Sequence, residues 1–108
     1  MQANDKSGIK IIDFGSGCFD DKKIYTYIQS RYYRAPEIIL QIPYTAAIDM
    51  WSYGCILYEL YTGMPLFVGV DELDHMSRIM EIKGIPPRTV MLESTRKSVF
   101  FDSQNQPR

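Results

Sequence analysis

Apolar residues in this chain fall into a few blocks, separated by polar stretches that contain glycine and proline. The first block, IKIID at residues 9–13, is short and β-branched and leads to glycines at positions 15 and 17. It predicts a strand that runs into a flexible turn. From residue 18 to 34 the polar and aromatic positions follow neither a period of 2 nor one of 3.6, which indicates an irregular surface segment.

Helix signals begin at Pro36. Proline suits a first helical turn because no amide partner is lost there, and Glu37 favours the positive end of the helix dipole. The residues PEIILQ therefore predict a short helix that closes before Pro43. A second, longer helix is expected from Thr45 as N-cap to a stop at Gly63.

This longer helix is apolar nearly all round, because Trp51, Leu57 and Leu60 cannot share one face. Such a helix normally lies inside a larger protein or a membrane. After it, residues 71–83 predict an amphipathic helix with Asp71 as N-cap, in which His75 is expected to be solvent-exposed. The remaining residues carry a weak helical pattern and then a polar end. The fold class is therefore mainly α, with a central helix that needs more neighbours.

Composition narrows the function classes. The chain has 108 residues and 45% apolar content, enough for one core, and its 12 basic and 13 acidic residues form no basic stripe, so nucleic acid is a poor default partner. Glu59 interrupts the longest apolar run, so no run reaches the roughly 20 residues needed to cross a bilayer, and no signal peptide is present. We expect a soluble intracellular chain, cytoplasmic or nuclear, whose Cys18 and Cys55 are reduced thiols.

Three short motifs occur in order along the chain: DFG at residues 13–15, APE at 35–37 and DMWSYGC at 49–55. The stretch YTYIQSRYYRAPE, residues 25–37, gathers four tyrosines and two arginines just before the first helix. The tripeptide DFG alone is weak, since Asp and Gly are common turn residues. The occurrence of all three motifs in this order is far more specific than any one of them.

With these motifs the chain resembles a protein kinase, from the DFG turn through the activation segment into the C-terminal lobe. YTYIQSRYYRAPE is similar to the dual-specificity tyrosine-regulated (DYRK) family of the CMGC group, in which a Tyr-x-Tyr pair precedes Ser-Arg-x-Tyr-Arg-Ala-Pro-Glu. IDMWSYGCILYELYTGMPLF and EIKGIP fit the same family. The resemblance implies a partial kinase domain over residues 9–100, with a DFG strand-turn and a buried central helix. Residues 1–8 are then a polar leader and 101–108 a polar tail.

The resemblance also implies roles for residues of the DFG turn and of the segment after it. Asp13 would bind the Mg²⁺ that bridges the ATP phosphates, a task suited to a hard oxygen ligand. Phe14 would pack against the lobe, with Gly15 completing the turn. Ser30 would line the platform for the target peptide, and Glu37 would pair with an arginine late in the lobe.

Further roles follow for the central helix, on the same resemblance. Asp49 would be buried and would hold the backbone of the catalytic loop, because a buried carboxylate must find donors. Trp51 and Gly54 would serve packing.

Tyr27, the second tyrosine of the pair, would be the residue that is phosphorylated, with Arg31 and Arg34 as receivers of its phosphate. Guanidinium groups bind phosphate oxygens in a bidentate manner, which suits this pairing. The Tyr-x-Tyr spacing of the family, rather than the bare chemistry, selects Tyr27.

Several kinase elements are absent from the sequence. There is no glycine-rich loop, no strand lysine paired with a helix glutamate and no His-Arg-Asp catalytic loop, so no catalytic residue is assigned. We therefore expect a fragment of a Ser/Thr/Tyr kinase that acts on protein substrates with ATP and Mg²⁺ only within a complete domain. The alternative is a truncated, non-catalytic, pseudokinase-like binding module. The oligomeric state stays open.

Overall fold

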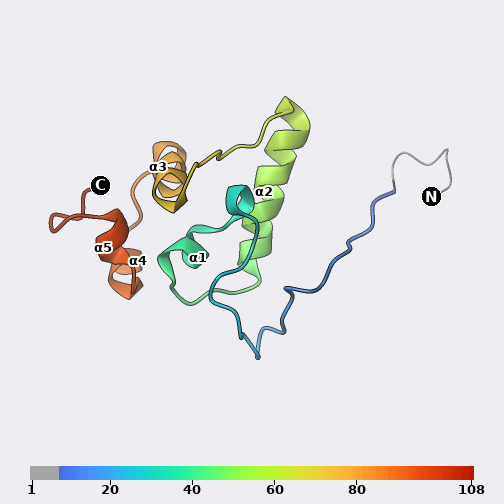
Figure 1. The fold of residues 1–108 in the computed structure, drawn as a ribbon, viewed down its shortest axis with the longest axis horizontal. Helices are drawn as coiled ribbons and strands as arrows, with labels where there is room; N and C mark the ends of the chain where they lie inside the picture. Colours follow the sequence, from blue (N-terminus) through green and yellow to red (C-terminus); the bar gives the residue numbers. More distant parts are fainter. Residues whose placement is uncertain (1–7) are drawn as a thin grey trace.

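The computed structural model describes residues 8–108 and is mainly helical (Figure 1). Its elements in chain order are η1 (Arg31–Tyr33), α1 (Pro36–Leu40), α2 (Ala47–Thr62), α3 (Glu72–Lys83), α4 (Arg88–Glu93) and α5 (Lys97–Phe100). Figure 1 shows the beginning of the described chain, drawn in blue, running as an extended trace away from the helices, whereas the residues just before η1 lie beside α2. The mainly α fold expected from the sequence is confirmed.

The strand expected at residues 9–13 is wrong. Among residues 8–108 no strand forms, and Ile9, Ile11 and Ile12 are 92%, 81% and 78% exposed. A strand is stable only when a neighbouring strand pairs with it, and the described residues offer none. The turn that should follow does form, because the amide of Gly17 donates to the carbonyl of Phe14 at 2.9 Å.

Three of the four predicted limits of α2 and α3 coincide with the observed caps, whereas the N-cap of α2 is Ala46 and not the predicted Thr45. Thr45 Oγ1 accepts from the amide of Ala47 at 3.2 Å, at the start of α2. Gly63 ends this helix in the left-handed region, at φ 79°, where a residue without a Cβ is favoured. The Asp71 side chain caps α3, and Gly84 ends it at φ 81°.

Two apolar clusters hold the helices together, and Trp51 packs against both. Its ring stacks on Phe67, with centroids 5.6 Å apart and planes 10° from parallel. The larger cluster is Ile39, Leu40, Cys55, Phe67, Met76, Ile79, Met80, Met91, Phe100 and Phe101, and the smaller is Ala35, Ile38 and Ile48.

The C-terminal residues do not fray, contrary to the expected polar tail. Phe101 is 1% exposed and belongs to the larger cluster. Asp102 Oδ1 then accepts from the amides of Gln104 and Gln106, both at 2.8 Å, and turns the chain back. The amide of Arg108 closes this turn on the carbonyl of Phe100 at 3.0 Å. The boundary drawn at residue 101 therefore cuts through a packed segment.

Helix α2 lies along one side of the helical body and exposes much of its apolar surface (Figure 1). Only Ile48 and Cys55 of this helix are buried, whereas Leu60 and Tyr61 are 78% and 93% exposed. Within residues 8–108 the expected shortage of neighbours is therefore confirmed. No helix in this part of the chain has the length and apolar character required to cross a bilayer.

Candidate functional site

Arg34 organises the segment that leads to α1. It is 5% exposed, and its guanidinium donates to the carbonyls of Ile28 at 3.0 Å and Gln29 at 2.8 Å. Its Nη1 also donates to the hydroxyl of Tyr27 at 2.7 Å, and its Cζ lies 4.0 Å from the centre of the Tyr27 ring. The structure therefore brings together the predicted tyrosine and one of the two predicted arginines.

Arg31, the other predicted phosphate receiver, points elsewhere. Its side chain is exposed and donates to the carbonyl of Val70 at 2.7 Å, on the loop before α3. Its docking role therefore stays a prediction.

A second arginine pairing, not identified from the sequence, lies beside Arg34. Glu72 Oε1 is 3.8 Å from Arg34 Nη1. The same carboxylate accepts from Arg96 at 2.7 Å and 3.3 Å. The hydrogen bond to Glu72 raises the pKa of Arg96 above its ordinary value. Because Glu72 and Arg96 are far apart in sequence and belong to no motif, nothing in the pattern indicated that they meet.

Gln29 is a further site residue that sequence reasoning missed. It adopts a left-handed backbone, at φ 67°, and its Nε2 donates to the carbonyl of Ile48 and to Ser52 Oγ, both at 2.9 Å. Its Oε1 accepts from the amide of Ala35 at 2.9 Å. The side chain thus fastens the loop to α2. A positive φ at a non-glycine residue costs energy, and these three hydrogen bonds offset it.

Tyr33 makes the next contact between this segment and α2. Its hydroxyl donates to Glu59 Oε2 at 2.6 Å, which raises the pKa of Tyr33. Together with Gln29, this bond fixes η1 against the helix. Ser30 lies exposed just before η1. It lines an open groove with Arg31 and the next two tyrosines, and its platform role stays a prediction.

His75, expected to be exposed on α3, is 1% exposed, so this expectation is wrong. Its ring meets Phe67 edge-on at 6.1 Å, and both ring nitrogens are buried without a hydrogen-bond partner. Burial lowers the pKa of His75, and a neutral imidazole results. Gly69 approaches closely, because a Cβ built there would lie 2.5 Å from His75 Cα. Gly69 is therefore required for this packing.

The DFG turn is open to solvent. Asp13 is exposed at φ 63°, and the ring of Phe14 is 74% exposed, so the packing of Phe14 on a complete lobe stays a prediction. Gly15 sits close to Asp13, because a Cβ added there would lie 3.4 Å from Asp13 Oδ1. No described segment covers this turn, and in residues 8–108 no three potential metal ligands gather. The carboxylate suits Mg²⁺ chemically but stands as a single ligand.

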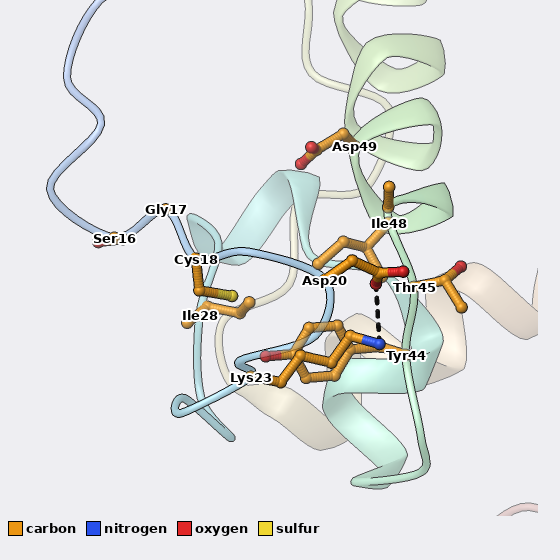
Figure 2. A pocket seen from close by; sticks show the side chains of 11 residues that line it. Ser16, Gly17, Cys18, Asp20, Lys23, Ile28, Tyr44, Thr45, Ile48 and Asp49 are labelled. Carbon is orange, nitrogen blue, oxygen red and sulfur yellow. Dashed lines mark ion pairs between the residues drawn. The ribbon is translucent and has the colours of Figure 1, made fainter.

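A shallow groove of about 210 Å³ lies between the segment after the DFG turn and the start of α2 (Figure 2). Lys23 and Asp20, on the same side of this groove, form an ion pair at 2.9 Å, and the Lys23 ammonium lies 5.5 Å above the ring of Tyr44. The Asp49 carboxylate borders the groove and is exposed. Among residues 8–108 the first turn of α2 faces solvent on that side, and the role of Asp49 in holding the catalytic loop stays a prediction.

The other two motifs, APE and DMWSYGC, contain both buried and exposed positions. Glu37 Oε2 and Trp51 Nε1 are buried without hydrogen-bond partners, and both residues line a second groove of about 300 Å³ with Lys83. Gly54 is exposed, and a Cβ added there would meet nothing within 4 Å. No described residue packs on Gly54, and its packing role stays a prediction.

Comparison with known proteins places this geometry in a family context. A family model described as "Protein kinase domain" matches residues 1–105. Dual specificity tyrosine-phosphorylation-regulated kinase 2 of Drosophila melanogaster is 55% identical over 108 residues, 100% of this chain and 15% of that protein. Dual specificity tyrosine-phosphorylation-regulated kinase 4 of Homo sapiens is 52% identical over 103 residues, 95% of this chain and 20% of that protein. The chain thus spans a fifth or less of the length of these relatives.

Proposed function

Because the chain belongs to the protein kinase domain family and is of the DYRK type, we propose that it provides the activation segment and following helices of a kinase catalytic domain. Such a domain transfers the γ-phosphate of ATP to serine, threonine or tyrosine side chains of proteins. The sequence lacks the glycine-rich loop and the His-Arg-Asp motif. Transfer therefore requires those elements from another segment, because positioning and charge neutralisation supply nearly all of this catalysis.

One observation carries the proposal: the buried guanidinium of Arg34 donates to the Tyr27 hydroxyl at 2.7 Å. A phosphate on that oxygen adds about −1.5 to −2 charges and three acceptors. Each hydrogen bond between charged groups contributes roughly 1.5–3 kcal/mol, against about 1–2 kcal/mol for ordering the backbone of one loop residue. Phosphorylated Tyr27 would thus order the loop and set the peptide platform at Ser30.

Two further residues take supporting roles in this proposal. Asp13 would hold Mg²⁺, which when bound neutralises charge on the ATP phosphates. Glu37 would fix the end of the platform through an arginine of the complete lobe. The buried, unpartnered Oε2 of Glu37 supports that pairing, because a buried carboxylate oxygen without a donor is costly.

The experiment places residues 8–108 in a complete domain of the fruit fly relative and measures phosphorylation of a peptide substrate. Tyr27→Phe should lower the rate at least about tenfold, because one charge-assisted contact of roughly 1.5 kcal/mol or more is lost. Tyr25→Phe is the matched control and should retain activity. Loss with Tyr25→Phe and none with Tyr27→Phe would overturn the assignment.

The chain by itself is expected to transfer no phosphate. Purified chain is incubated with labelled ATP and Mg²⁺, and incorporation is measured. Incorporation that Asp13→Ala abolishes would refute the requirement for the missing elements.

A further inference from the structure

Arg34 needs a counter-charge. Its side chain is 6% exposed, and an unpaired buried cation is strongly unfavourable. Glu72 supplies the counter-charge, but Arg34 Nη1 and Glu72 Oε1 are 3.8 Å apart, beyond hydrogen-bond distance. The interaction of Arg34 with Glu72 is therefore weak. The short hydrogen bond of Arg34 Nη1 goes instead to the hydroxyl of Tyr27, at 2.7 Å.

Arg96 holds Glu72 far more tightly. Its two terminal nitrogens reach the two carboxylate oxygens at 2.7 Å and 3.3 Å, the fork-shaped pairing typical of arginine and carboxylate. Arg96 Nη1 also donates to the carbonyl of Ile39 at 3.1 Å, and its Cζ lies 5.3 Å over the Phe100 ring. Arg96 is thus held by α1, α3 and α5 together.

The charges explain why two arginines share one carboxylate. Arg34 and Arg96 contribute +2 and Glu72 contributes −1, which leaves +1 next to the Tyr27 oxygen. Without Arg96, Arg34 alone would face both Glu72 and a phosphate of about −1.5 to −2 charges, and the like charges would repel. Without Glu72, Arg34 would lack a counter-charge whenever Tyr27 is unmodified.

We propose that Glu72 is the counter-ion of Arg34 while Tyr27 is unmodified, and that Arg96 retains Glu72 when a Tyr27 phosphate takes Arg34. Arg96 is then a positioning residue: it touches neither substrate nor phosphate, and it acts by neutralising Glu72. The inference rests on the proposed function, in which Tyr27 carries the phosphate. It adds Glu72 of α3 and Arg96, just before α5, to the residues that respond to phosphorylation of Tyr27.

Two other titratable or charged groups lie near Arg34. Arg31 is engaged with the carbonyl of Val70, and His75 is buried. Burial is the main cause of the lowered pKa of His75. Backbone contacts with Arg34 and Phe67 oppose this effect, and the charges of Arg34 and Arg31 lower the pKa by a smaller amount. His75→Gln therefore accompanies the test, so that titration of the imidazole is not mistaken for titration of the phosphate.

The test installs phosphotyrosine at position 27 during translation of the whole chain and follows the phosphate by ³¹P NMR against pH. The second phosphate pKa is measured in the native chain and in concentrated urea. The phosphorylated chain without a further substitution is the background, and Arg96→Gln, Glu72→Gln and the double variant are compared with it. Arg78→Gln is the matched control, because Arg78 is also paired with a carboxylate on α3, Asp74 at 3.0 Å. Arg96→Lys keeps the positive charge but cannot form the bidentate pair with Glu72.

The native phosphate pKa should lie about one unit below its value in urea, since cations favour the dianion. Arg96→Gln should remove most of this shift, Glu72→Gln should enlarge it, and the double variant should return close to the background. Arg96→Lys should retain most of the shift, and Arg78→Gln and His75→Gln should leave it unchanged.

Three results overturn different parts of the reasoning. Equal phosphate pKa values in the native chain and in urea would refute docking of the phosphate on the arginines. The proposed function, in which phosphorylated Tyr27 orders the loop, would fail with it. A shifted pKa that neither Arg96→Gln nor Glu72→Gln alters would refute only the role of the Glu72–Arg96 pair. A loss in Arg96→Gln that the double variant does not recover means a damaged fold rather than a freed Glu72, and also overturns the inference.

Discussion

Acid should destabilise this fold through His75. The imidazole is 1% exposed, both its nitrogens lack hydrogen-bond partners, and burial lowers its pKa. An unfolded histidine has a pKa of about 6.5, so above that pH both states are neutral and His75 adds no pH dependence to the stability. Below it the unfolded chain binds a proton that the folded chain resists. The free energy of unfolding should therefore fall as pH drops, by up to about 1.4 kcal/mol per pH unit, until the lowered folded pKa is reached.

The assay is urea unfolding followed by circular dichroism between pH 8 and pH 5, with His75→Gln as the control. Glutamine keeps a polar side chain but does not titrate in this range, so the difference between the two pH profiles isolates His75. The wild-type chain should lose stability relative to His75→Gln from about pH 6.5 downward. Parallel profiles for the two chains would refute the reasoning, because the imidazole would then be as free to protonate in the folded state as in the unfolded state.

Three further substitutions test the packing. Arg34→Gln should cost about 3 kcal/mol in urea unfolding, because three loop groups lose their donor, and protease should cut residues 18–33 faster; unchanged cleavage would contradict this. Gly69→Ala should cost about 1–3 kcal/mol, because its Cβ would lie 2.5 Å from a backbone atom of α3, and an unchanged unfolding midpoint would show that the loop shifts freely. Leu60→Lys should change the free energy of unfolding by less than about 0.5 kcal/mol, because Leu60 is 78% exposed, and a larger shift of the unfolding midpoint would contradict this.

Local signals in the sequence were sufficient for the helices. Thr45, Gly63, Asp71 and Gly84 act within one turn of the chain, so each limit could be predicted from its neighbours alone. The strand at residues 9–13 failed for the opposite reason, because a strand depends on a partner that no local pattern supplies.

Only those residues of the candidate site that belong to a sequence motif could be predicted. The YTY and RAPE segments led to Tyr27 and Arg34, which do meet at 2.7 Å. Gln29 was missed because its role depends on where α2 lies, and the Glu72–Arg96 pair was missed because 24 residues separate its members. Hydrophobic periodicity likewise could not place His75, because a polar residue on an amphipathic helix is ordinarily solvated.

Trp51 gives this chain a built-in optical reporter. It is the single tryptophan of the sequence, and it packs against both apolar clusters while its ring stacks on Phe67. Its indole Nε1 is buried without a hydrogen-bond partner, so water that reaches it would change the polarity around the ring. Separation of the two clusters should therefore shift its fluorescence emission to longer wavelength. Opening between the two apolar clusters can thus be followed without any added label.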